Sequence, residues 1–359
     1  MVKPLFKKFS FAALVTFLFF LLVHCSSSET TGKKPSESAQ LDSEKESEIS
    51  QPVPEAKSKI PVFLDTDANN ELDDQHAMAY LFFNKDVFDV RGVTVNATYN
   101  GGDIDKQLDE AVRVMKLCNV FTSTPVVKGA NGSFEEILPD VNDFTFDGQL
   151  GVDFMVAEAL LKRDQKLVIL AVGKLTNVAL ALAKQKYIAE NIRIVWLGSN
   201  YPEPGEYNQD NDEAALEYIL KMDVPFEMVT VRYGKPSGSD AVRATPVKIE
   251  SELAGAGPMV SAVRGRHGGS FQYFGDYSID LFKNAELHGE PPSRALFDMV
   301  AVAILKNPAW GESKIIPSPK LENKSWIEQP ENERTIVLWE NFDAESILDD
   351  FYGVLQDAK

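Results

Sequence analysis

Short apolar runs alternate with amphipathic patterns along most of the chain. The runs are rich in Val, Ile, Leu and Phe, and helical patterns lie between most of them. The predicted strands cover residues 61–65, 90–95, 125–128, 167–172, 192–197, 226–231 and 335–339, and predicted helices include residues 73–84, 106–117, 152–162 and 175–184. Strands that are apolar on both faces and alternate with helices are typical of a parallel sheet covered on both sides. The pattern therefore predicts an α/β fold, with a mainly parallel central sheet and helices on both faces.

The N-terminal segment has the pattern of an export signal. Residues 1–8 contain three lysines, and residues 9–23 form an apolar run that is short for a membrane span. The run ends in Leu-Val-His-Cys at residues 22–25, which resembles the lipobox of bacterial lipoproteins, although His24 stands where that motif normally has Gly, Ala or Ser. We predict a signal peptide over residues 1–25, with Cys25 lipidated and the mature protein anchored in the bacterial outer membrane or lying in the periplasm. An uncleaved anchor and an ordinary cleaved signal are the alternatives.

Composition divides the remaining chain into a linker and one large domain. Residues 26–58 are mostly Ser, Glu, Lys, Thr and Pro, which predicts a disordered tether, and residues 59–359 form the α/β domain. The net charge of −18 argues against nucleic acid as a partner. If Cys25 belongs to the signal, Cys118 is the one remaining cysteine, so no intrachain disulfide is expected in the domain. The sequence leaves the oligomeric state open, a homo-oligomer included.

Carboxylates cluster directly after the first predicted strand. Four aspartates and one glutamate lie within ten positions, at Asp65, Asp67, Glu71, Asp73 and Asp74, just before the first predicted helix. Ligand sites in such folds lie beyond the carboxyl ends of the strands. Capping of the helix accounts for one or two carboxylates, but several at one strand end repel each other unless a cation is present. Hard oxygen ligands without nearby His or Cys select calcium or magnesium.

The spacing of these aspartates resembles the inosine–uridine-type nucleoside hydrolases, which hold a calcium ion at this place. In that family three residues separate the second and third aspartates, whereas residues 68–72 make this loop two residues longer. Three further segments are similar to family motifs. They are residues 169–179 (strand, Gly-rich turn and Leu-Thr-Asn helix start), residues 206–208 (Glu-Tyr-Asn) and residues 294–303 (the helix that carries the last aspartate).

The resemblance implies a calcium-dependent hydrolysis of the N-glycosidic bond of a ribonucleoside or similar riboside. Asp67 would be the general base that activates water. The implied calcium ligands are Asp67, Asp74, Asp298 and the carbonyl of Val172. The implied substrate contacts, to ribose hydroxyls, are Asp73, Glu206 and Asn208, with Asn100 assisting.

The leaving-group side departs from the family pattern. Phe297 occupies the position of the histidine that protonates the departing base, and no histidine occurs between Lys85 and His267. His267, in the Gly-rich basic segment 264–271, is a candidate replacement acid, and a solvated loop histidine is the alternative. We interpret His288 as a loop residue and His76 as structural. Base preference stays open.

Two other functions remain at this stage. Haloacid-dehalogenase-like phosphatases also begin with Asp-Xaa-Asp after the first strand, but they need Thr or Val where this chain has Asn69. A non-catalytic surface lipoprotein that binds nucleosides or ribose through calcium is the second alternative, and the missing histidines favour it. Turnover of a nitrophenyl riboside separates the enzyme from the binder.

Overall fold

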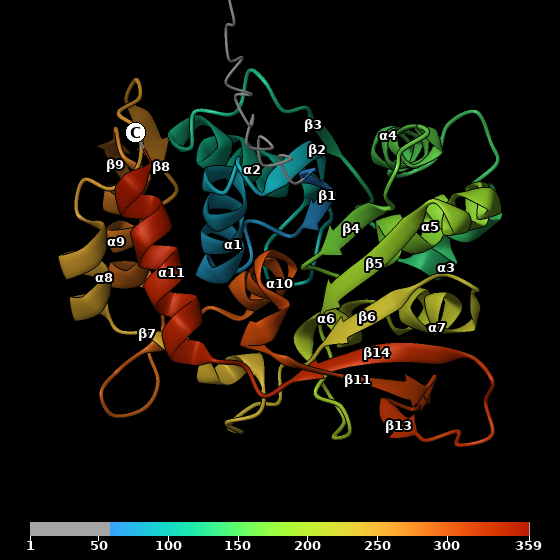
Figure 1. The fold of residues 1–359 in the computed structure, drawn as a ribbon. Coiled ribbons are helices and arrows are strands. Elements are labelled where there is room, and N and C mark those ends of the chain that lie inside the picture. The colour runs from blue at the N-terminus through green and yellow to red at the C-terminus, as the bar shows by residue number, and fades with distance from the viewer. Residues whose placement is uncertain (1–57, 359) are drawn as a thin grey trace, which may run out of the picture. The chain divides into compact units, whose positions relative to one another are not determined.

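The computed structural model describes residues 58–358, so the predicted signal peptide, Cys25 and nearly all of the predicted linker lie outside the described residues. Its main sheet has eight strands in the order β11-β14-β6-β5-β4-β1-β2-β3, and every neighbouring pair is parallel except β11 and β14 (Figure 1). The strands are β1 (Ile60–Thr66), β2 (Phe88–Val95), β3 (Val126–Lys128), β4 (Leu167–Ala171), β5 (Ile192–Leu197), β6 (Phe226–Val229), β11 (Glu312–Pro317) and β14 (Thr335–Glu340). All seven predicted strands belong to this sheet, so the predicted fold class is confirmed.

Alternating side chains of the strands enter two separate cores. In β4, Val168 and Leu170 face one core, whereas Leu167 and Ile169 face the other. The first core is closed by α1 (Leu72–Phe83), α2 (Ile104–Leu117), α8 (Pro246–Leu253), α9 (Phe274–Asn284), α10 (Phe297–Lys306) and α11 (Ala344–Asp357). The second is closed by α3 (Phe134–Ile137), α4 (Gln149–Leu160), α5 (Thr176–Lys184) and α7 (Glu213–Lys221). Helices thus cover both faces, as strands apolar on both sides require (Figure 1).

The strand β11 was not predicted, and its exposure explains why. Five of its six residues are exposed, and it lies at the sheet edge, paired antiparallel with β14. An edge strand with so little buried surface carries no apolar run. Three small two-stranded sheets complete the described strands: β7 (Arg243–Ala244) with β10 (Arg294–Ala295), β8 (Val263–Gly265) with β9 (Gly268–Phe271), and β12 (Lys320–Glu322) with β13 (Ser325–Ile327).

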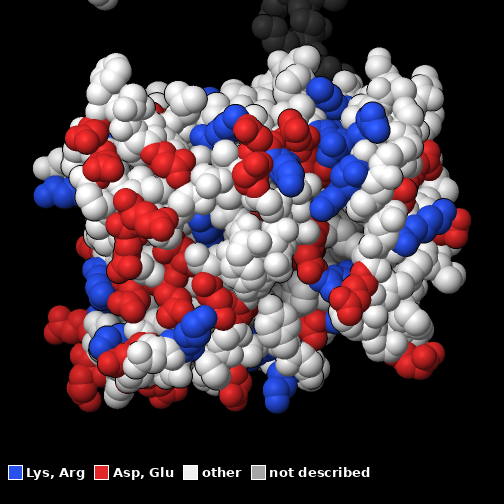
Figure 2. Space-filling model, turned by 180° about the vertical axis from the view of Figure 1, so that it is seen from behind, with Lys and Arg blue, Asp and Glu red and all other residues white. Residues whose placement is uncertain are grey.

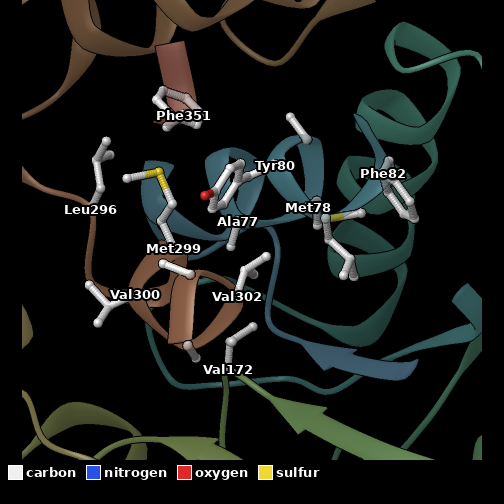
Figure 3. Close-up of a cluster of buried hydrophobic side chains, with 14 of the residues drawn as sticks. Ala77, Met78, Tyr80, Phe82, Val172, Leu296, Met299, Val300, Val302 and Phe351 are labelled. Atoms are coloured by element: carbon white, nitrogen blue, oxygen red, sulfur yellow. The ribbon is translucent and has the colours of Figure 1, made fainter. Parts of the chain in front are cut away.

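Packing between α1 and α10 fixes the place where both helices begin. Figure 3 shows Ala77 of α1 close to Val302 of α10, with Val172, which follows β4, below them. All three side chains are almost completely buried. Asp74 lies three residues before Ala77, and Asp298 lies four residues before Val302. The core therefore holds the two acidic helix starts beside the carboxyl end of β4.

The described surface is acidic over much of its area. On the face in Figure 2, acidic side chains are spread over the left half, whereas Lys and Arg gather in the upper right part. Cys118 is buried with a free thiol. Within residues 58–358, no helix has both the length and the apolar character that crossing a membrane requires.

Candidate active site

Asp65 anchors the carboxyl end of β1. Its carboxylate is completely buried and accepts hydrogen bonds from Thr94 Oγ1 (2.6 Å), Asn177 Nδ2 (2.8 Å) and Asn96 Nδ2 (3.1 Å). These donors come from neighbouring β2, from Asn96 just after it and from the start of α5. Burial raises the pKa of Asp65 to about 6, and the three hydrogen bonds oppose this rise. Asp65 therefore joins three segments and fixes the strand end that carries Asp67.

Asp67 follows β1 and enters the cavity described below. Thr98 Oγ1 donates a 2.6 Å hydrogen bond to Asp67 Oδ2. The other oxygen, Oδ1, lies near Gly173, because a Cβ built on that glycine would stand only 2.8 Å from it. Burial, helped by the charges of Asp65 and Glu206, raises the pKa of Asp67 to about 7 against the opposing Thr98 hydrogen bond. One oxygen is thus held in place while the other remains available.

Three more carboxylates meet at the starts of two helices. Asp73 and Asp74 lie in the first turn of α1, and Asp298 lies in the first turn of α10. One oxygen from each lies within 4.8 Å of the others, and all three residues are buried. Thr66 Oγ1 donates a hydrogen bond to Asp74. Burial and mutual repulsion raise the pKa of Asp73 to about 7 and those of Asp74 and Asp298 well above their usual values.

This cluster has the properties of a cation site. Within residues 58–358, no Lys or Arg forms an ion pair with Asp67, Asp73, Asp74 or Asp298. Helix N-termini supply some favourable potential, but buried carboxylates normally need a full positive charge. An all-oxygen donor set fits a hard divalent cation such as calcium or magnesium. Of the four predicted metal ligands, Asp74 and Asp298 lie in this cluster, together with Asp73, which was predicted only as a ribose contact.

Val172 and Asn208 are joined by a direct hydrogen bond. Asn208 Nδ2 donates to the carbonyl oxygens of Val172 (2.9 Å) and Leu197 (3.0 Å), which follow β4 and end β5. Both protons of the amide are therefore used, and Asn208 Oδ1 is left as an acceptor. The Val172 carbonyl retains a second lone pair, since a carbonyl oxygen has two.

Glu206 caps the short helix α6 (Tyr207–Asn211) rather than projecting freely. Its carboxylate accepts hydrogen bonds from the backbone N–H groups of Ser199 (2.9 Å), Asn208 (3.1 Å) and Gln209 (3.0 Å). Burial raises the pKa of Glu206, and these three hydrogen bonds oppose the rise. A carboxylate has about four acceptor positions, so one remains for a ligand hydroxyl.

Apart from Asp65, the acidic groups described above line one cavity of about 390 Å³ at the carboxyl ends of the strands, together with Val172 and Asn208. Its acidic part contains Asp67, Asp73, Asp74, Asp298, Glu206 and Glu71, together with Asn70, Asn208 and Val172. The rest of its wall carries Leu197, Tyr207, Val231, Tyr233, Asp240, Arg243, His288, Arg294, Ala295 and Phe297. The volume lies in the range of small-molecule sites. The cavity wall thus combines many carboxylates with aromatic and cationic side chains.

The wall beyond the carboxylates is partly aromatic. Tyr233 and Phe297 form an edge-to-face pair with ring centroids 5.9 Å apart. Phe297 directly precedes Asp298, so this pair lies next to the cation site. Burial raises the pKa of the Tyr233 hydroxyl, and the nearby charges of Glu206 and Asp73 raise it further. Such a pair offers an apolar surface for a planar ring.

Two residues that the sequence suggested for the site are not in the cavity. Asn100 is exposed, and its backbone N–H donates to the Tyr207 hydroxyl (3.1 Å). His267, in the β8–β9 segment, lies 3.3 Å from Asp280 and lines an adjoining cavity, which shares Asn70, Glu71 and Arg294 with the first. The prediction for Asn100 followed motif spacing, whereas the chain leaves the site after Thr98, since Tyr99 and Asn100 are exposed.

Several residues at the site escaped the sequence analysis, among them Asn96, Arg294 and His288. Asn96 is completely buried after β2, and its Oδ1 has no hydrogen-bond partner among the described residues. Its place directly after a predicted strand is the signal that could have found it. Arg294 and His288 also line the cavity, and His288 lies in the loop between α9 and β10, as its interpretation as a loop residue predicted. His76 is structural as predicted, because it is buried with Nε2 2.7 Å from Ser278 Oγ.

Solved structures with the same fold are nucleoside hydrolases. A plant nucleoside hydrolase matches with a TM-score of 0.64 at 16% identity, covering 84% of this chain and 100% of that one. A purine-preferring ribonucleoside hydrolase from Gardnerella vaginalis matches with a TM-score of 0.60 at 18% identity, covering 82% and 100%. An inosine-uridine preferring nucleoside hydrolase from Bacillus anthracis matches with 0.57 at 14%, covering 83% and 99%. At these identities the likeness establishes the fold. No curated protein matches the chain in sequence.

The sequence pattern of the inosine-uridine preferring nucleoside hydrolases matches residues 62–343, and the chain belongs to this family. It is accordingly an N-glycosyl hydrolase that acts on ribonucleosides. Membership of this family argues against the haloacid-dehalogenase-like phosphatase that the sequence had left as an alternative.

Proposed function

We propose that this protein hydrolyses the N-glycosidic bond of a ribonucleoside or similar riboside with the help of calcium bound at the carboxylate cluster. The observation that carries the proposal is the group of buried oxygens from Asp73, Asp74 and Asp298 within 4.8 Å, beside Asp67 and without an ion-paired Lys or Arg among residues 58–358. Asp67, Asp74, Asp298 and the Val172 carbonyl would hold the ion. When bound, calcium would lower the pKa of a coordinated water and compensate the carboxylate charge.

Asp67 is the general base in this proposal. Thr98 fixes Asp67 Oδ2, so Asp67 Oδ1 is the oxygen that takes the proton from the attacking water. The water oxygen then bonds to C1′ of the ribose while the bond to the base breaks. The transition state carries positive charge on the sugar, as in other glycosyl transfers. The buried carboxylates around the ribose would stabilise that charge.

Three further residues of the cavity orient the ribose in this proposal. Asp73 and the remaining acceptor position of Glu206 would bind sugar hydroxyls, and Asn208 Oδ1 is free to accept a hydroxyl proton because its Nδ2 is committed to two carbonyls. Binding the ribose in one orientation places C1′ where the activated water can attack it, which lowers the entropic part of the barrier. Asn100 has no part in this proposal because it lies outside the cavity.

Release of nitrophenol from para-nitrophenyl riboside tests the proposed function. Its leaving group departs as a stable anion and needs little protonation. The protein should therefore cleave this substrate even without a general acid near the leaving group. We expect release by the wild-type protein with calcium and none by Asp67→Ala. Saturable nucleoside binding without release from any riboside would instead support the non-catalytic binder.

We also propose that the mature protein is exported and anchored through lipid on Cys25. The support is the basic, then apolar, then Leu-Val-His-Cys pattern of residues 1–25. A fatty-acid analogue should label the wild-type protein and not Cys25→Ser. Equal labelling of both proteins would rule out this anchor.

A further inference from the structure

In the family pattern a histidine occupies the position of Phe297 and protonates the departing base. In this chain that histidine is missing from the side of the cavity proposed to contact the base. A departing base develops negative charge on a nitrogen, so a hydrogen-bond donor in this region would lower the barrier. In the proposed function the carboxylates bind the ribose. Apart from Asn70 and Asn208, the cavity-lining side chains that carry nitrogen donors are Arg243, Arg294 and His288.

Arg243 is already committed to its neighbours. Arg243 Nη1 pairs with Asp240 Oδ1 (2.6 Å), and Arg243 Nε donates to Ser293 Oγ (3.0 Å). These contacts hold the segment before Arg294 in place. His288 lies at the other end of the same turn, where its backbone N–H and carbonyl both bond to Ser293 at 2.9 Å. The turn from His288 to Ser293 is thus fixed on the cavity wall at both ends.

Arg294 determines which nitrogen of His288 carries the proton. Arg294 Nη1 lies 3.2 Å from His288 Nε2. A guanidinium only donates, so Nε2 must accept, and the proton of the neutral imidazole is then on Nδ1. Among the described residues, no hydrogen-bond partner of Nδ1 is present. His288, an exposed residue that lines the cavity, therefore carries an N–H donor on Nδ1.

Glu71 holds Arg294 in turn. Its carboxylate forms an ion pair with Arg294 Nη2, whose side chain is 13% exposed. Glu71 is the N-cap residue of α1, yet its side chain makes no cap hydrogen bond and turns to Arg294 instead. Glu71 belongs to residues 68–72, the loop that is two residues longer than in the family pattern. The longer loop thus supplies the carboxylate that orients the arginine.

We propose that His288 stabilises the departing base through a hydrogen bond from Nδ1–H, with Arg294 and Glu71 as the positioning residues that set its tautomer and place. The inference rests on the proposed function. The electron pair of the C1′–N bond goes to the base nitrogen, and His288 Nδ1–H donates to a nitrogen or oxygen of the base as it leaves. The released base takes a proton from solvent, and Asp67 returns the proton of the attacking water to solvent.

Steady-state kinetics of the full chain on two leaving groups test this inference. The substrates are inosine and para-nitrophenyl riboside, and the variants are His288→Ala, His288→Gln, Arg294→Gln and His267→Ala. We expect His288→Ala to lower kcat for inosine about 10²-fold, as loss of one transition-state donor does, with little change for the nitrophenyl riboside. Arg294→Gln should show the same selectivity with a smaller loss. His288→Gln keeps an N–H donor and should recover part of kcat.

His267→Ala is the matched histidine substitution and should leave both rates near the wild-type values, because this side chain lies outside the cavity. Equal losses on both substrates in His288→Ala, a change in KM alone, or no change would overturn the inference. A selective loss in His267→Ala would transfer the role to that residue. Wild-type release of nitrophenol without any inosine cleavage would refute the donor but keep the hydrolase, whereas no release from either substrate would refute the proposed function itself.

Discussion

Thr98 Oγ1 donates a 2.6 Å hydrogen bond to Asp67 Oδ2, which directs Asp67 Oδ1 toward Gly173. A Cβ on residue 173 would stand 2.8 Å from Asp67 Oδ1 and 2.9 Å from Asn96 Oδ1. The absence of a side chain at Gly173 therefore gives the reactive oxygen its space. A side chain at position 173 would collide with Asp67 Oδ1 and Asn96 Oδ1, and both of these residues are buried.

Gly173→Ala should consequently displace Asp67 and reduce turnover of every riboside. A displacement near 1 Å costs about 10²-fold in rate. Gly353→Ala is the matched control, because a Cβ there meets nothing within 4 Å and lies inside α11. The control should keep full kcat and gain about 0.5–1 kcal/mol of stability, since Ala is favoured over Gly in helices. Wild-type kcat in Gly173→Ala would contradict the role given to Asp67 Oδ1.

Asp298→Asn should lose stoichiometric calcium while its metal-free form becomes more stable. Burial and repulsion from Asp73 and Asp74 raise the pKa of Asp298, so a neutral amide removes an unfavourable charge. An ion that binds only the folded state stabilises it by mass action, so calcium should raise the Tm of the wild type but not that of Asp298→Asn. Isothermal titration and thermal melts measure both effects. Exposed Asp164→Asn is the control and should bind calcium like the wild type. Full calcium occupancy in Asp298→Asn would show that Asp298 is a structural residue and not a calcium ligand.

The metal-free protein should lose stability as pH rises from about 4 to above 7. The folded pKa values of Asp65 (about 6), Asp67 (about 7) and Asp73 (about 7) lie above the ordinary 3.8, so folding favours the protonated forms. Their stabilising contribution is complete below the unfolded pKa and is lost as pH rises through the folded pKa values. Melts in chelator should therefore show a falling Tm across this range, and calcium should oppose the fall because it compensates the charge. Parallel Tm profiles with and without calcium would count against a cation at these carboxylates.

Asn208→Ala should combine a loss of stability with weaker substrate binding. The Nδ2 group of Asn208 bonds to the carbonyls of Val172 and Leu197 at two strand ends, and its removal leaves buried acceptors without a donor. An unsatisfied buried group costs about 1–3 kcal/mol. Asn208→Asp retains an oxygen but not the amide protons and should be destabilised at least as much. Chemical denaturation together with KM measures the two effects. Unchanged stability in both variants would show that the two hydrogen bonds are not needed.

The sequence predicts the sheet because its strands are buried on both faces. Runs such as Leu167–Ala171 have no polar position, so their assignment needs no knowledge of the partner strand. The exposed edge strand β11 carries no such signal. The acidic ligands are also predictable, because Asp67, Asp73 and Asp74 lie together in the chain and Asp298 interrupts a helix that is otherwise apolar.

The base side of the cavity is not predictable in the same way. Arg294 contacts Glu71 across more than two hundred residues, and neither residue belongs to a periodic pattern or an apolar run. His288 precedes a glycine and two prolines in a loop, so nothing in its local sequence distinguishes it from a solvated histidine. Only the folded arrangement, in which β7 pairs with β10 before the start of α10, brings His288 and Arg294 to the cavity.

The calcium dependence of nucleoside cleavage tests the central claim most directly. Purified protein is stripped with chelator, and release of base and ribose is then followed while free calcium is raised and calcium binding is measured on the same sample. The proposed function predicts no release without the ion and turnover that rises in proportion to one bound calcium per chain. It also predicts that Asp67→Ala releases no base at any calcium concentration. Full turnover in the chelated protein, or in Asp67→Ala, would contradict the proposed function.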